Sequence, residues 1–239
     1  MIDGATASET EQGGYTRPSR KVQLAEVSVL LFLVLPQMLL AAFVRDHRGD
    51  WTFPLVAVSS ITRYLALLVL IFFLLWRNGE PLSSIGWRAA KAAREIALGI
   101  ALVGPLRLAW TMFAALLSVL GRSERWRVPQ LPAPAGWPQF VLAFFYLVVV
   151  AVTEETFFRG YLLLRLHAVT GKIWPALLLS AAAFAIEHTY QGSTGMAWAF
   201  GGGLAFGVVY LWRKSLIAPA VTHLLVDITF LLRASIHAG

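Results

Sequence analysis

Long runs of apolar residues constrain this chain more than any other feature of its sequence. Hydrophobic residues make up 58% of the 239 residues and charged residues only 14%, whereas roughly a quarter of a soluble domain is charged. A large soluble core is a poor explanation, because too few polar residues remain to cover it. Runs of helical length instead predict an all-α, polytopic transmembrane bundle of about seven spans, in a range of six to eight.

The predicted spans divide the chain into a short tail and one membrane domain. Residues 1–22 are small and polar and predict a disordered tail, and residues 23–239 form a single transmembrane domain. The length of the first apolar run favours a retained anchor over a cleaved signal peptide. The expected spans are Ala25–Val44, Phe53–Trp76, Glu95–Leu120, Phe140–Leu166, Ile173–Tyr190, Gly195–Trp212 and Leu216–Leu232.

Basic residues cluster between the apolar runs, and their distribution predicts the orientation. Those expected on the N-terminal side are Arg17, Arg20, Lys21, Arg77, Arg88, Lys91, Arg94, Arg165, Lys172, Arg213 and Lys214. Fewer fall on the opposite side: Arg45, Arg48, Arg122, Arg125, Arg127 and Arg233. The positive-inside rule therefore predicts a cytoplasmic N-terminus.

Composition also excludes several functional classes. No basic stripe interleaved with aromatic residues stands in a polar segment, so no nucleic-acid partner is expected despite the net charge of +7. The lipid bilayer is the expected surrounding. The absence of cysteine excludes disulfides, thiolate metal sites and a cysteine nucleophile.

Small residues in two late spans predict close helix packing. Gly203 and Gly207 stand four residues apart, and a run of small residues extends from Ser180 to Ala183. Such patterns let the backbones of membrane helices approach one another.

Ionisable residues are costly inside a bilayer, and several gather in the last spans. In the segment Thr153–Gly160, Glu155 precedes Arg159 by four residues, the favoured order for a helical ion pair. Glu154 points about 100° away around the helix. This division predicts that Arg159 neutralises Glu155 and leaves Glu154 free to act as a general base.

Two histidines complete the polar set. His223 and Asp227 are four residues apart, as are Phe184 and His188. At about 1.5 Å rise per residue, Glu154, His188, His223 and Asp227 lie at similar depths near the midplane. The sequence therefore predicts one shared, water-accessible cavity in preference to separate ion pairs that only lock helices together.

Other ionisable residues in the spans are interpreted as structural. Glu187 is expected to be a solvated or helix-packing residue near the outer interface, and Arg63 and Arg107 are expected to snorkel or to pair.

The ionisable residues of the last spans form three motifs, which in chain order read Glu154-Glu155-Thr-Phe-Phe-Arg159, Phe184-Ala-Ile-Glu-His188 and His223-Leu-Leu-Val-Asp227. Together they resemble the CAAX-protease and bacteriocin-processing family of intramembrane glutamic endopeptidases, whose eukaryotic member is the Ras-converting enzyme. The resemblance covers about 139–232 and is specific through the combination of motifs on apolar helices.

The resemblance implies catalytic roles for Glu154, His188, His223 and Asp227. Glu154 and His188 would activate a water that hydrolyses a peptide bond, and His223 and Asp227 would stabilise the oxyanion. Many relatives carry Asn where this chain has Asp227, and an ionised Asp cannot donate a hydrogen bond. Asp227 is therefore either protonated or, as we prefer, a residue that orients His223.

The resemblance also implies supporting roles and a partner. Glu155, Arg159 and Phe184 would support the site, no cofactor or metal is required, and the partner would be a membrane protein or peptide substrate. A short chain with small loops is typical of a prokaryotic inner-membrane protein.

Three alternatives remain open at this stage. A metal-dependent membrane protease could use the same residues, although the compact His-Glu-x-x-His spacing is missing. A non-catalytic binding or immunity protein could use the same cavity. A proton-coupled transporter fits less well, because no inverted repeat is evident.

Overall fold

Helices are the only regular secondary structure over the residues that the structure describes. The structure, a computed structural model, describes residues 18–44, 52–88, 90–120 and 134–238, with side chains over 18–36, 52–88, 90–120 and 134–232. No strand occurs in these ranges. The helices are α1 Arg20–Val44, α2 Phe53–Arg77, η2 Leu82–Ile85, α3 Ala92–Val119, α4 Gly136–Glu154, η3 Glu155–Leu162, α5 Leu163–Thr170, α6 Ile173–Glu187, η4 His188–Gln191, α7 Gly192–Arg213 and α8 Ile217–Ala238.

Every predicted span falls on helix except at two end residues, Leu120 and Leu216, which confirms the all-α membrane fold. Among the described residues, four helical stretches are long and apolar enough to cross a membrane: Phe53–Arg77, Ala92–Val119, Gly136–Thr170 and Ile173–Arg213. Large apolar side chains such as Phe32, Val69 and Met112 point outward and are 77%, 65% and 65% exposed, as expected of surfaces that face lipid. Residues 1–17 of the predicted tail lie outside the described residues, and α1 begins at Arg20, before the predicted end of the tail.

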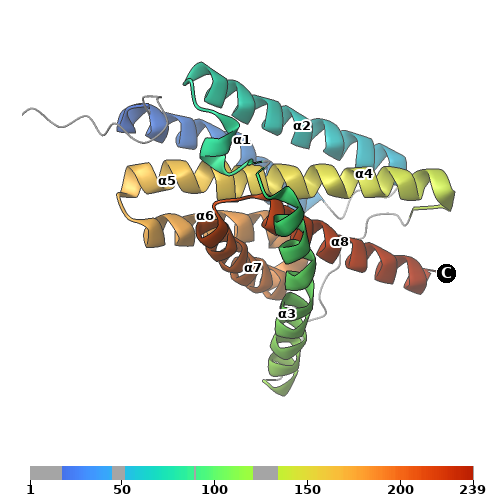
Figure 1. Ribbon diagram of the computed structural model, residues 1–239. Coiled ribbons are helices and arrows are strands. Elements are labelled where there is room, and N and C mark those ends of the chain that lie inside the picture. The colour runs from blue at the N-terminus through green and yellow to red at the C-terminus, as the bar shows by residue number, and fades with distance from the viewer. Residues whose placement is uncertain (1–17, 45–51, 89, 121–133, 239) are drawn as a thin grey trace, which may run out of the picture.

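A continuous helical run forms the axis of the molecule. The helices α4, η3 and α5 follow one another without a break, with α2 alongside (Figure 1). The segment η3 is a π-helix, where the sequence predicted regular α-helix. Such π segments are rare and frequently mark functional sites. The two adjacent glutamates lie where α4 passes into η3.

Helices α6 and α7 form a tight antiparallel hairpin. A Cβ atom at Gly203 would lie 3.1 Å from the Cα atom of Ala181, and one at Gly207 would lie against Leu177. The paired residues run in opposite directions along the two helices, which confirms that the small residues permit close packing. The helix α3 instead contacts α8 and runs across the direction of α4 (Figure 1).

One basic residue differs from its predicted role. Arg165 is fully buried, not a topology determinant at the surface. Its Nε atom donates to Glu26, at 3.0 Å, and its two terminal nitrogens donate to Glu80. Tyr161 also donates to Glu26, at 2.6 Å. This network ties α1 and the segment after α2 to the central run.

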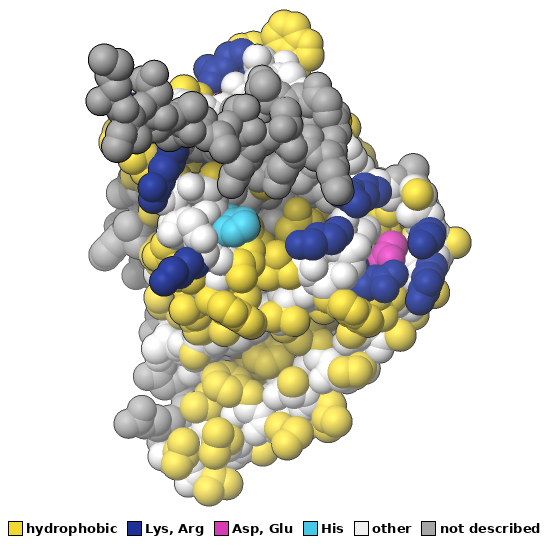
Figure 2. All heavy atoms as spheres, turned by 60° about the vertical axis from the view of Figure 1, so that its left-hand side comes forward, with side chains coloured by type: hydrophobic (Ala, Val, Ile, Leu, Met, Phe, Trp, Pro, Cys, Tyr) yellow, Lys and Arg dark blue, Asp and Glu magenta, His cyan; other side chains and the backbone are white. Residues whose placement is uncertain are grey.

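Lys and Arg side chains gather on the face shown in Figure 2. Exposed residues of the predicted basic side are Arg20, Lys21, Arg77, Arg88, Lys91, Arg94, Lys172 and Lys214. Arg17, Arg45, Arg48, Arg122, Arg125 and Arg127 lie outside the described residues, as does the side chain of Arg233.

Candidate active site

The π segment packs tightly enough to bury both glutamates. Glu154 is 5% exposed and Glu155 is fully buried. A Cβ atom at Gly160 would lie 3.0 Å from the carbonyl oxygen of Ile85, so glycine lets η2 approach the segment. The hydroxyl of Ser180 donates to the carbonyl oxygen of Phe158, at 2.7 Å, and fixes η3 against α6.

The predicted ion pair between Glu155 and Arg159 is present. The Nη1 atom of Arg159 lies 2.9 Å from Oε1 of Glu155, and both side chains are buried. The guanidinium also lies over the ring of Phe184, 4.1 Å from its centroid, and 5.3 Å from that of Phe206. Cation–π contacts of this kind are strongest where water is excluded. Phe184 therefore contacts both the cation and, at 4.5 Å between ring centroids, His188.

His223 reaches from α8 into the space between three carboxylates. Its Nδ1 atom lies 2.8 Å from Oε1 of Glu155, and it donates there because a carboxylate only accepts. Its Nε2 atom lies 3.7 Å from Oε2 of Glu154 and 3.5 Å from Oδ2 of Asp227. These are ion-pair distances, too long for good hydrogen bonds. A hydrogen on Nε2 is thus available to a further acceptor.

Glu154 has a hydrogen-bond partner, whereas the sequence predicted that it would be free. Tyr64 on α2 donates its hydroxyl hydrogen to Oε1 of Glu154 at 2.9 Å. His188 lies where α6 gives way to η4, and its Nδ1 atom is 2.8 Å from the carbonyl oxygen of Phe184. A carbonyl oxygen only accepts, so Nδ1 donates and Nε2 is the ring nitrogen left for other chemistry.

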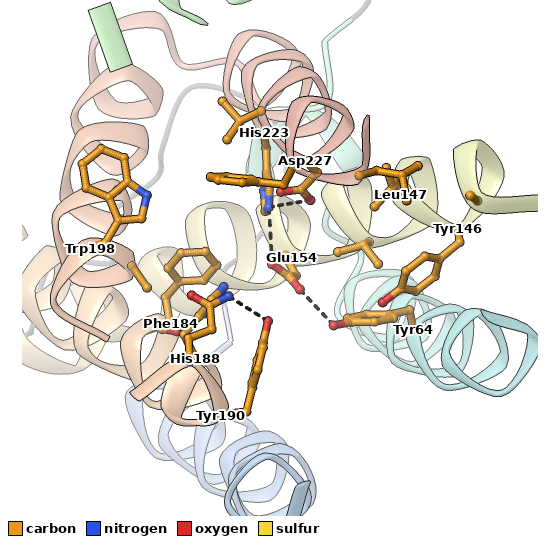
Figure 3. Close-up of a pocket in the computed structure, with 18 of the residues that line it drawn as sticks. Tyr64, Tyr146, Leu147, Glu154, Phe184, His188, Tyr190, Trp198, His223 and Asp227 are labelled. Carbon is orange, nitrogen blue, oxygen red and sulfur yellow. Dashed lines mark hydrogen bonds and ion pairs between the residues drawn. The ribbon is translucent and has the colours of Figure 1, made fainter. Parts of the chain in front are cut away.

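The four predicted catalytic residues line one cavity, shown in Figure 3. Its volume is about 230 Å³. Glu154 enters from the central run, His188 from η4, and His223 and Asp227 from α8. Tyr64, Tyr146 and Trp198 supply much of the remaining wall. The predicted convergence of these four side chains on one cavity is therefore present in the fold.

The three remaining ionisable residues of the spans are Arg63, Arg107 and Glu187, and the structure corrects the interpretation of Glu187. Arg107 pairs as expected: its Nη1 atom donates to the hydroxyl of Thr229 at 3.0 Å. Arg63 is exposed and lies over the ring of Tyr64, at 5.5 Å. Glu187 is 9% exposed, so the interpretation of a solvated residue is wrong. Its Oε1 atom lies 3.4 Å from the Tyr64 hydroxyl.

The positions of the acidic and imidazole side chains bear on whether the site could bind a metal ion. Within the described residues, no group of three or more His, Cys, Asp or Glu side chains is arranged to hold a metal ion. The carboxylates of Glu154, Glu155 and Asp227 instead lie against His223, and Glu154 and Glu155 also contact Tyr64 and Arg159, respectively.

Comparison with known proteins agrees with this geometry. Residues 136–229 match the family model described as type II CAAX prenyl endopeptidase Rce1-like. This segment belongs to the Rce1-like family. The matched segment contains Glu154, His188, His223 and Asp227, and it confirms the family that the motifs resemble. At the level of the family, it supports a CAAX-type intramembrane protease. No curated protein and no solved structure matches the chain.

Proposed function

We propose that this protein is an intramembrane glutamic endopeptidase that cleaves a peptide bond of a membrane-associated protein or peptide. The observation that carries the proposal is the convergence of Glu154, His188, His223 and Asp227 on one largely apolar cavity. Ionisable groups at membrane depth are costly and are retained mainly for function. The match to a protease family supports the same conclusion.

In the proposed reaction, Glu154 is the general base. It takes a proton from a water held between its carboxylate and Nε2 of His188, and the hydroxide attacks the carbonyl carbon of the substrate. The peptide C–N bond breaks when the tetrahedral intermediate collapses, and Glu154 returns the proton to the leaving amine. One water is consumed, and no redox step is involved.

His223 is the proposed oxyanion donor. With Nδ1 donating to Glu155 at 2.8 Å, a protonated Nε2 can donate to the developing negative charge, since no short hydrogen bond from it occurs within the described residues. Such preorganised donors act strongly in a water-poor site. Asp227, 3.5 Å from Nε2, orients the ring and supports its charge.

We also propose a location and an orientation. The protein is an integral membrane protein of the prokaryotic inner membrane, with the basic face of Figure 2 in the cytoplasm. The start of α1 carries Arg20 and Lys21, so the N-terminus shares this side.

The decisive experiment compares the membrane proteome of the native host with that of a strain carrying Glu154→Gln. The substitution keeps the shape of the side chain and its acceptor for Tyr64 but removes the base. We expect new protein termini in the wild type that are missing from the variant. The cleavage site found in this way supplies a fluorogenic peptide, and turnover of this peptide by the purified variant should fall at least ~10²–10⁴-fold.

Glu95→Gln is the matched control. Glu95 pairs with Arg213, at 2.5 Å, away from the cavity, so its loss should leave turnover unchanged. Identical proteomes would favour a non-catalytic binding protein. Activity lost on treatment with EDTA and restored by zinc would favour the metal-dependent alternative.

A further inference from the structure

Three residues stand between two cavities. Tyr64, Glu154 and Tyr190 line the cavity described above, and they also line a second one of about 310 Å³. His188, His223 and Asp227 line only the first cavity. Glu187 lines only the second, together with Arg63 and apolar residues of α1, α2 and η3. Glu187 therefore lies beyond Tyr64 as seen from the reacting groups.

The Tyr64 hydroxyl contacts both carboxyl groups but has a single hydrogen. Its oxygen lies 2.9 Å from Oε1 of Glu154 and 3.4 Å from Oε1 of Glu187. The shorter distance is typical of an O–H···O hydrogen bond, and the longer one is that of a weak hydrogen bond. The hydrogen of Tyr64 is therefore directed to Glu154, and a lone pair of its oxygen faces Glu187.

An ionised Glu187 would be poorly accommodated in this position. It has no hydrogen to offer the Tyr64 oxygen, so two oxygen lone pairs would face each other. None of the ion pairs among the described residues includes Glu187, and its buried Oε2 atom has no hydrogen-bond partner there. Arg63 lines the same cavity but forms no ion pair with Glu187, and a buried carboxylate without such a pair is costly. A proton on Oε1 removes both problems, because Glu187 then donates to Tyr64.

We propose that Tyr64 and Glu187 are positioning residues for Glu154, arranged as a chain in which protonated Glu187 donates to Tyr64 and Tyr64 donates to Glu154. The chain holds Oε1 of the base in place and leaves Oε2 toward His223. Neither residue takes part in bond making. This inference rests on the proposed function of Glu154.

The first test uses steady-state kinetics on the fluorogenic peptide described above. Tyr64→Phe should lower kcat roughly 10–100-fold, as expected when a hydrogen bond to a charged group is lost, with KM changed less than kcat. Glu187→Gln should retain activity, because its amide N–H donates to Tyr64 as the protonated acid does. Glu187→Leu should lower kcat, and it should add no further loss in the Tyr64→Phe background, because Glu187 acts through Tyr64.

Tyr161→Phe is the matched control. It also removes a hydrogen bond from a tyrosine to a buried glutamate, Glu26, but does so outside the site. It should lower thermal stability about as much as Tyr64→Phe and leave kcat unchanged. Full activity of Tyr64→Phe, or a greater loss for Glu187→Gln than for Glu187→Leu, would overturn the inference. Activity of Glu154→Gln would instead overturn the proposed function.

Infrared spectroscopy of the purified protein tests the proton without turnover. The carbonyl stretching band of a protonated carboxylic acid should disappear in Glu187→Gln. In Tyr64→Phe the band should remain and shift, because its hydrogen bond is lost. Identical bands in the wild type and Glu187→Gln would show that Glu187 is ionised and would refute the chain.

Discussion

The Nδ1 atom of His223 lies 2.8 Å from Oε1 of Glu155, the same oxygen that Arg159 contacts at 2.9 Å. One carboxylate oxygen thus holds a cation on the central helical run and an imidazole on α8. The carboxylate that binds His223 most closely is Glu155, not Asp227. Glu155 therefore links helix packing to the orientation of the proposed oxyanion donor.

Replacing Glu155 should damage both stability and turnover. Glu155→Gln leaves the buried guanidinium of Arg159 without its counter-charge, and breaking a buried pair typically costs about 3–5 kcal/mol of unfolding free energy. Arg159→Ala should destabilise similarly. Glu155→Gln should also lower kcat, because His223 loses its charged partner. Melting curves in detergent and turnover assays measure the two effects.

A double change separates these effects. Glu155→Leu with Arg159→Leu removes both charges, so much of the lost melting temperature should return. Turnover should not return, because His223 remains without an acceptor on Nδ1. Recovery of turnover together with stability would mean that the contact between Glu155 and His223 has no role in the reaction.

His188→Ala should abolish turnover and leave the protein folded. The ring of His188 is half-buried at the cavity, and its one short bond among the described residues goes to the carbonyl oxygen of Phe184, so little of the packing depends on it. Without the imidazole, the water beside Glu154 loses its second partner, and the rate should fall by ~10²–10⁴-fold. A melting temperature equal to that of the wild type serves as the folding control.

The crossing of α3 and α8 offers a test of packing with a control on the same helix. A Cβ atom at Gly99 would lie 2.8 Å from both the carbonyl oxygen of Ala218 and the Cβ atom of Val221. Gly99→Ala must therefore push the helices apart, at a cost of about 1–3 kcal/mol. At Gly104 nothing lies within 4 Å of the same atom, so Gly104→Ala should be neutral or stabilise by about 0.5–1 kcal/mol. Equal melting temperatures for the two variants would contradict this crossing.

The features that the sequence predicted correctly are those that depend on the spacing of residues along the chain. The apolar runs located the helices because helix length in a membrane follows from bilayer thickness. The pair of Glu155 and Arg159 followed from residues four apart. The meeting of Glu154 with His188 and His223 required only that helices of similar length lie side by side.

The parts that the sequence did not predict depend on which faces of distant helices meet. Nothing in the α2 sequence distinguishes Tyr64 as the residue that reaches Glu154, because that contact requires the packing of α2 against α4. Glu187 resembled an interfacial residue, yet it is buried beside a cavity that residues of α1, α2 and η3 also line. Arg165 resembled a topology determinant, but it is buried and pairs with Glu26 of α1 and with Glu80. A polar residue without an evident partner is the one signal that could have identified all three.

Asp227 provides the last test, because it departs from the Asn of many relatives. The amide oxygen of Asn can face Nε2 of His223, as the carboxylate does at 3.5 Å, and the amide nitrogen can also donate to an oxyanion. Asp227→Asn should therefore retain turnover. Asp227→Leu can neither face Nε2 of His223 with an oxygen nor donate to an oxyanion, so it should lower kcat roughly 10–100-fold. The melting temperature should change little, because the carboxylate is 26% exposed. If Asn and Leu lower kcat equally, the negative charge itself is required, and Asp227 acts by supporting a cationic His223. If neither variant loses activity, Asp227 has no part in the reaction, and His223 is oriented by Glu155 alone.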